Sequence, residues 1–83
     1  MIRKYQSNES LIENYVENYI IDKSRIYHEY REDVYKDFIK NNPDCNISSH
    51  YFTRHINRIC GTTLKLVCEN GRLVYIFVKK EEE

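Results

Sequence analysis

The sequence predicts a single small α+β domain in which three helices are followed by a β-hairpin. Two observations favour this order. Apolar residues recur at helical spacing in three segments before residue 61, and two β-rich runs then flank Asn70-Gly71. The chain has 83 residues, 41% apolar and 31% charged, which is typical of a folded domain with one modest core. We expect a flexible arm at residues 1–8, the domain at 9–80 and an acidic tail at 81–83.

The first helix is expected from about residue 9 to residue 20. Ser7 or Asn8 can cap its start, and Glu9 is favourable in its first turn. Its apolar stripe consists of Leu11, Ile12, Tyr15, Val16 and Tyr19. The following segment lacks a helical period, and we expect Ile26 and Tyr27 to form a short extended stretch.

The second helix is expected within REDVYKDFIKNNPD. Its apolar stripe consists of Val34, Tyr35, Phe38 and Ile39. It should end at Asn41-Asn42-Pro43, because proline disfavours helix in the residue before it. Residues 44–47 then form a turn.

The third helix is expected in SSHYFTRHINRIC, from a cap at Ser48 or Ser49 to Gly61, which can adopt the left-handed conformation that ends helices. Its buried side should consist of Phe52, Ile56 and Ile59. Its polar side should consist of His50, Thr53, Arg54 and Asn57, with Arg58 on the flank.

The hairpin is the strongest local signal, because Asn-Gly is a preferred pair for a two-residue loop. Such a loop pairs Glu69 with Arg72. Each residue before Glu69 then pairs with the residue that lies equally far after Arg72. The inner face, expected to cover the helices, consists of Leu64, Leu66, Cys68, Leu73, Tyr75 and Phe77. The outer face consists of Lys65, Val67, Glu69, Arg72, Val74, Ile76 and Val78. This outer face is apolar enough that we expect an edge contact or a partner to cover part of it.

Three helices followed by a hairpin is the order of the winged-helix variant of the helix-turn-helix. In that architecture the third helix enters the major groove of DNA and the hairpin, or wing, contacts the adjacent backbone or minor groove. The order alone does not decide function, since many winged helices bind proteins instead.

Three short segments resemble a known family, the C-terminal domains of poxvirus- and phage-type primase-helicases. They are VENYIIDKSRI, the run Val34-Tyr35-Lys36-Asp37-Phe38, and the spacing of Ser48, Phe52 and Ile56. The resemblance covers roughly residues 9–80; the tryptophan common in or after the second helix of the family is absent here. It implies a domain that follows a hexameric helicase module and contacts DNA, or guides it to the helicase ring, during replication of a virus or mobile element.

The charge distribution favours DNA as the partner, although the net charge is zero. Residues 9–44 hold nine acids and five bases, whereas residues 48–80 hold six bases and the single acid Glu69. Arg54 and Asn57 are suited to guanine and adenine edges, respectively. The full set of predicted contacts with duplex, forked or single-stranded DNA is Ser49, His50, Tyr51, Thr53, Arg54, Asn57, Arg58, Lys65, Arg72, Lys79 and Lys80.

Five of the eight tyrosines can be assigned to a core or a surface role from their positions. Tyr15, Tyr19, Tyr35 and Tyr75 occupy apolar-stripe positions and are expected in the core. Tyr51 lies beside the polar side of the third helix and is the best candidate for stacking on a base.

Metal binding and catalysis are not expected. Cys45, His50, His55 and Cys60 are zinc-ligand types at intervals of five residues. Five residues turn a helix by about 140°, so His50 and His55 should point to different sides. No phosphate loop, oxyanion hole or paired-carboxylate cleft is recognisable. We therefore predict no metal, no catalytic residue and no cofactor in this domain.

Three cysteines without paired spacing indicate a reducing, intracellular compartment, which would be the host cytoplasm for a viral protein. No apolar run is long enough for a membrane span. The competing hypothesis is a winged helix that docks on a protein through its outer hairpin face or its acidic first two helices. A free-standing transcriptional regulator would need a dimerisation helix, and none follows the hairpin.

Overall fold

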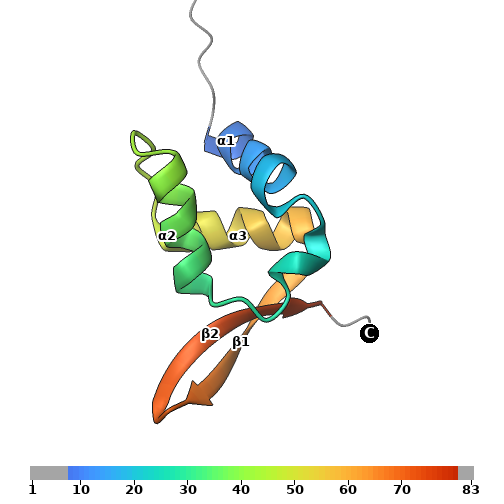
Figure 1. The fold of residues 1–83 in the computed structure, drawn as a ribbon, viewed down its shortest axis with the longest axis vertical. Helices are drawn as coiled ribbons and strands as arrows, with labels where there is room; N and C mark the ends of the chain where they lie inside the picture. The colour runs from blue at the N-terminus through green and yellow to red at the C-terminus, as the bar shows by residue number, and fades with distance from the viewer. Residues whose placement is uncertain (1–7, 81–83) are drawn as a thin grey trace, which may run out of the picture.

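The computed structural model describes residues 8–80. The arm and the acidic tail predicted at the chain ends lie outside the described residues, apart from Asn8, which begins the first helix. The elements in chain order are α1 (Asn8–Tyr15), a π-helical turn η1 (Val16–Ile20), a 3₁₀ turn η2 (Lys23–Ile26), α2 (Arg31–Asn41), α3 (Ser49–Cys60), β1 (Thr62–Glu69) and β2 (Arg72–Lys79). Figure 1 shows α1 and α2 on either side of α3, with the hairpin extending below the three helices.

The predicted three helices and hairpin are therefore confirmed. Ser48 caps α3 by accepting a hydrogen bond from the amide of Tyr51, and Gly61 ends the helix with a left-handed φ of 68°. The hairpin has the predicted register, with Glu69 opposite Arg72 and Leu64 opposite Phe77. These boundaries follow from local chemistry, namely a side-chain cap, a residue without Cβ and a two-residue loop.

The core lies where the three helices and the base of the hairpin meet. Phe38 of α2 and Phe52 of α3 are fully buried, with ring centroids 4.9 Å apart, and Phe77 of β2 is fully buried as well. Tyr15 packs edge-on against Phe38 and donates a hydrogen bond of 2.8 Å to Asp37. The predicted core positions of Tyr15 and Tyr35 are confirmed, since Tyr15 is buried and Tyr35 packs against the core cluster.

The connection between α1 and α2 differs from the prediction. Ile26 belongs to η2 and is not extended, whereas Tyr27 has the predicted extended backbone angles, and His28 follows with a positive φ of 71°. His28 donates its amide hydrogen to the carbonyl of Phe77, the amide of Phe77 donates to Glu29, and Tyr30 forms an isolated bridge with Ile76. Residues 28–30 therefore occupy the outer edge of β2 near its base.

The predicted cover of the inner hairpin face is wrong in the distal half. Leu64 is half-buried and Phe77 buried, but Leu66 is 49%, Leu73 68% and Tyr75 44% exposed, and Cys68 is exposed. Among the described residues, Arg31 of α2 lies over the ring of Tyr75 and Tyr30 bonds to Glu69, but these contacts leave Leu66 and Leu73 exposed. On the outer face Ile76 is buried, because the segment at Tyr30 pairs with it and supplies the expected edge contact. Tyr19 is also exposed, contrary to its predicted core position.

The chain turns sharply after η1. Ile21 has φ 65° and ψ −66°, and the amide of Asp22 donates to the carbonyl of Ile20 at 2.6 Å. This is a γ-turn of the rare form, which is strained for a β-branched residue. Asp22 then caps η2, and its hydrogen bonds from the amide and hydroxyl of Ser24 lower the pKa of its carboxyl.

Candidate nucleic-acid interface

The solvent-facing side of α3 carries a line of three basic side chains. His50, Arg54 and Arg58 are all exposed. They are four residues apart, so they lie along one stripe of the helix surface. The opposite side of α3 is formed by Phe52 and Ile56, both fully buried. We call the residues His50, Arg54 and Arg58 the α3 basic stripe.

Arg54 lies at the centre of the stripe, and its side chain makes no hydrogen bond or ion pair with any residue in the range 8–80. Its guanidinium is therefore exposed and can present its fork of donors outward. His50 is exposed as well, one turn towards the start of the helix. These two positions agree with the prediction that this side of α3 is open to a partner.

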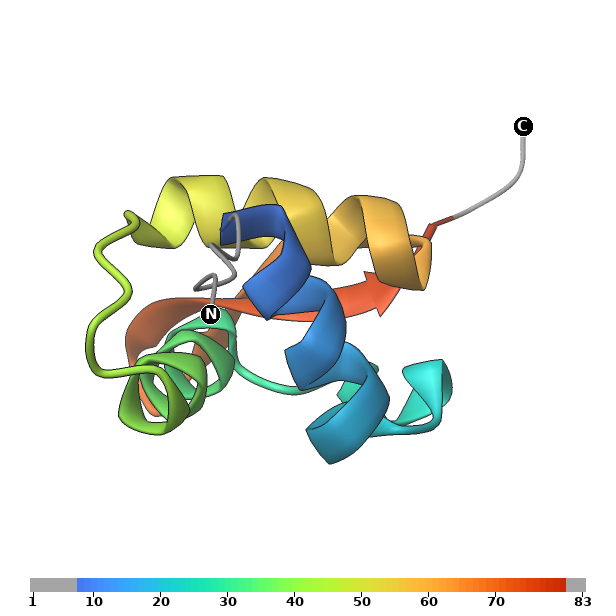
Figure 2. The same ribbon diagram turned by 90° about the horizontal axis from the view of Figure 1, so that it is seen from above.

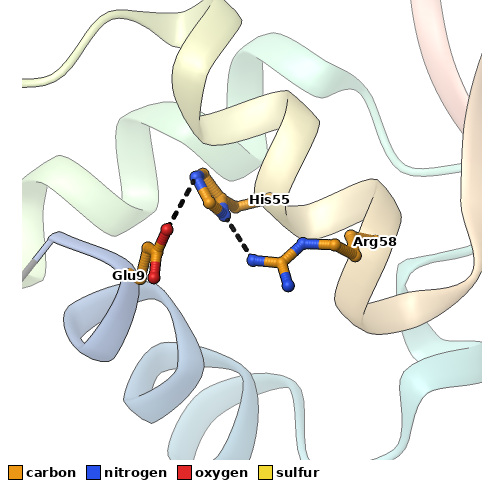
Figure 3. A network of polar contacts seen from close by, with 3 residues as sticks. All are labelled: Glu9, His55 and Arg58. Carbon is orange, nitrogen blue, oxygen red and sulfur yellow. Dashed lines mark hydrogen bonds and ion pairs between the residues drawn. The ribbon is translucent and has the colours of Figure 1, made fainter.

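Arg58 is held by a neighbour rather than projecting alone. Its guanidinium donates to Nδ1 of His55 at 2.8 Å, and Nε2 of His55 lies 3.8 Å from a carboxylate oxygen of Glu9 on α1 (Figure 3). The ring of His55 also packs against Tyr51, with centroids 4.5 Å apart. The bond from Arg58 requires a lone pair on Nδ1, which places the ring hydrogen on Nε2, facing Glu9. Glu9 and His55 therefore orient Arg58. The carboxylate of Glu9 offsets part of the positive charge of Arg58.

Thr53 is a correction to the predicted polar side. It is only 5% exposed, and its hydroxyl donates to the carbonyl of Ser49 at 2.7 Å. The helix position of Thr53 lies at the border of the two sides, and neighbouring elements cover it. Its hydroxyl is thus used within α3, and it is not part of the exposed surface.

Asn57 is half-buried, and its Oδ1 accepts a hydrogen bond of 2.9 Å from the hydroxyl of Thr62, which is 2% exposed. Bidentate pairing with adenine needs both Oδ1 and Nδ2 directed at the base. Because Thr62 holds Oδ1 towards β1, Asn57 joins the end of α3 to the first residue of the hairpin. Its predicted exposure on the polar side is wrong, and its geometry does not favour the adenine pairing.

The predicted hairpin lysines lie near the base of the hairpin. Lys65 and Lys79 line one shallow depression together with His28, a residue that the sequence analysis did not single out. The amide of Lys80 donates to the carbonyl of Gly61, so Lys80 lies beside the C-terminal end of α3. Figure 2 shows the ends of α3 and β2 on the same side of the molecule. Basic side chains at this end of a helix are also favoured by its dipole.

Arg72 lies apart from these groups, at the tip of the hairpin. It is paired with Glu69 and shares a depression with Glu32 and Asp33 at the start of α2. The hydroxyl of Tyr30 donates to the carboxylate of Glu69, and this bond raises the pKa of Tyr30. The same depression is lined by the bases Arg31 and Lys36 as well as by Glu32, Asp33 and Glu69, so charges of both signs lie around Arg72.

Ser49 and Tyr51, the remaining predicted contacts, lie at the start of α3 and are half-buried. Tyr51 packs on His55, so the face of its ring is partly used within the protein. Within residues 8–80, no three His, Cys, Asp or Glu side chains are arranged to hold a metal ion, and Cys45, His50, His55 and Cys60 do not gather. None of the helices in this range has the length and apolar character of a membrane span.

No family model matches the chain, and the searches of curated proteins and of solved structures also found no match.

Proposed function

We propose that this chain is a winged-helix module that binds DNA, with α3 in the major groove and the base of the hairpin against the phosphate backbone. The observation that carries the proposal is the α3 basic stripe, with Arg54 exposed and without an intramolecular partner among the described residues. The order α1, α2, α3, β1, β2, with residues 28–30 hydrogen-bonded to β2 between α1 and α2, supports the winged-helix assignment.

Each basic residue has a distinct part in this proposal. Arg54 contacts a guanine edge, since its guanidinium fork matches the two acceptors of guanine. Arg58, held in orientation by His55, contacts a phosphate oxygen. Lys79 and Lys80 contact phosphates from beside the C-terminal end of α3. Arg72 lies apart from these residues, at the tip of the hairpin, and is not counted among the proposed contacts.

The salt dependence of binding follows from this count. Arg58, Lys79 and Lys80, the three residues placed on phosphates, together would give a slope of log affinity against log salt of about −3 on duplex DNA. Binding by one copy should therefore be weak and should fall steeply with salt. The parent assignment, as the C-terminal domain of a viral or mobile-element primase-helicase, rests on the resemblance within residues 9–80. Copies arranged around a hexameric ring would bind more tightly through avidity.

The test is a titration of duplex, forked and single-stranded DNA at several salt concentrations with Arg54→Ala and a matched control, Lys40→Ala. Lys40 is an exposed cation in the last turn of α2, away from the proposed interface. We expect Arg54→Ala to weaken binding by about 1–3 kcal/mol with little change in slope, and Lys40→Ala to change neither affinity nor slope. Salt-insensitive binding, or equal effects of the two variants, would refute the proposal.

Protein docking is a second candidate function, favoured by one specific feature. Tyr19 and Ile21 are 55% and 67% exposed beside a depression lined in part by Glu29, Asp33 and Asp37. An apolar pair next to acids suits a basic, partly apolar protein segment. The variant Tyr19→Ser/Ile21→Ser separates the two functions, since it should leave the DNA titration unchanged and abolish docking of such a segment.

A further inference from the structure

The outer edge of β1 is unpaired among the described residues. In a hairpin with a two-residue loop, Glu69 and Arg72 exchange hydrogen bonds, and every second residue before Glu69 does the same with β2. Thr62, Leu64, Leu66 and Cys68 therefore direct their amides and carbonyls away from β2. The bond from the amide of Lys80 to Gly61 agrees with this alternation. No backbone hydrogen bond within residues 8–80 reaches this edge, whereas residues 28–30 cover the equivalent edge of β2 near its base.

The same half of the hairpin exposes apolar side chains. Leu66 is 49% and Leu73 68% exposed, and Leu73 lines an open depression between the hairpin and the start of α2. A free edge of eight residues with apolar side chains is a template for pairing with another strand, unless charges or bulges block it. Within β1 the charged side chains are Lys65 and Glu69. The positions of these two charges determine which partner strand can pair with β1 so that opposite charges face each other.

We propose that β1 pairs antiparallel with β1 of a second copy of this chain, about a two-fold axis through Val67. Residues that lie opposite each other in an antiparallel sheet share a face. A two-fold axis through a residue places that residue opposite the same residue of the second copy. An axis through Lys65 would oppose two lysines, and an axis through Leu66 would oppose Lys65 with valine. The axis through Val67 places Lys65 opposite Glu69 of the second copy, and does so twice.

The same register provides neighbours for the exposed apolar residues. Leu66 of each copy lies opposite Cys68 of the other, on the face that also carries Leu73 and Tyr75. The two hairpins then form one four-stranded sheet with a continuous apolar strip across its centre. Cross-strand pairs of both kinds, apolar and oppositely charged, stabilise antiparallel sheets. The second copy thus satisfies the free backbone groups, the two charges and the apolar side chains together.

Disulfide trapping tests the register. Val67 of the two copies would form a directly opposed, non-hydrogen-bonded pair with Cα atoms about 4.5 Å apart, within the range of a disulfide. Val67→Cys in a Cys68→Ser background should therefore cross-link rapidly on mild oxidation. Leu66→Cys in the same background should cross-link slowly, because those residues would lie two positions out of register, at about 8 Å. Cys68→Ser alone is the control and should remain uncross-linked.

Charge reversal tests the partner by sedimentation velocity without nucleic acid. The wild-type chain should dimerise with rising concentration, and Lys65→Glu should raise the dissociation constant about tenfold by creating two like-charge pairs. Lys65→Glu/Glu69→Lys should restore the wild-type value. Glu69→Lys alone should behave like Lys65→Glu, which separates pairing from loss of the Tyr30 bond. A monomer at all concentrations, a dimer indifferent to Lys65→Glu, or equal cross-linking at positions 66 and 67 would overturn the proposal. The DNA proposal would be unaffected.

Discussion

Replacing Asn57 with alanine should destabilise the fold rather than remove a DNA contact. The side chain accepts the hydroxyl of Thr62, which is 2% exposed, at 2.9 Å. In Asn57→Ala that hydroxyl stays buried without its partner, which costs about 1–3 kcal/mol. Alanine is the better helix former by roughly 0.6 kcal/mol, which offsets part of this. We therefore expect a net loss of about 1–2 kcal/mol in the free energy of unfolding.

Urea and thermal unfolding measure this loss. For a domain of this size, 1 kcal/mol corresponds to about 4–8 °C in Tm, so Asn57→Ala should lower Tm by roughly 4–16 °C. Thr62→Val removes the donor and leaves Asn57 accessible to water, so it should cost less than about 1 kcal/mol. The double variant should be no less stable than Asn57→Ala alone, because the buried hydroxyl is then absent.

DNA binding, measured well below the transition temperature, separates this explanation from base recognition. Asn57→Ala should retain most of the wild-type affinity, whereas Arg54→Ala should weaken binding without lowering Tm. If Asn57→Ala keeps the wild-type urea midpoint and abolishes DNA binding, the inference from the Thr62 contact is refuted. In that case Asn57 would be a base-reading residue, as the sequence alone predicts.

Two further predictions concern groups away from the interface. Tyr15→Phe should lose about 1 kcal/mol near neutral pH, since the hydroxyl of Tyr15 donates to Asp37. Burial, followed by the bond to Asp37, raises the pKa of Tyr15 above its ordinary value of 10.0. The unfolded chain therefore loses this proton at a lower pH than the folded chain. The difference in the free energy of unfolding between wild type and Tyr15→Phe, measured by urea titration, should shrink above pH 10. A constant difference would contradict this. Alkylation, followed by mass spectrometry, should show exposed Cys68 modified first and half-buried Cys45 second, because burial raises the pKa of the Cys45 thiol. Buried Cys60 should be modified only on unfolding, and its early modification would contradict its burial.

Local chemistry explains which elements could be predicted from sequence. The bounds of α3 depend on Ser48 and Gly61, and the hairpin register depends on Asn70-Gly71. Each signal acts within a few residues, so no knowledge of the rest of the fold is needed. Tyr27 is extended as predicted, but Ile26 ends a 3₁₀ turn, and the segment that pairs with β2 is residues 28–30, because its position depends on Phe77, far later in the chain.

The cover of the hairpin could not be predicted for a geometric reason. Alternation correctly assigns Leu73 and Tyr75 to the same face as Phe77. It does not tell how closely the helices pack along that face: they bury Phe77 at its base, whereas Arg31 only lies over the ring of Tyr75, and Leu73 is 68% exposed. The period of a strand thus predicts which side a residue takes, whereas burial depends on the length of the element that lies opposite.

The same distinction applies to the candidate interface. The helical period places His50, Arg54 and Arg58 on the outer side of α3, and all three are exposed. Thr53 and Asn57 lie at the border of that side, where the beginning of β1 and the neighbouring elements decide exposure. Net charge is equally uninformative without positions, since Arg72 shares a depression with both acids and bases, whereas the guanidinium of Arg54 forms no ion pair with any described residue. Arg54 therefore tests the DNA proposal most directly, because its loss removes a charge from the surface without removing a contact from the fold.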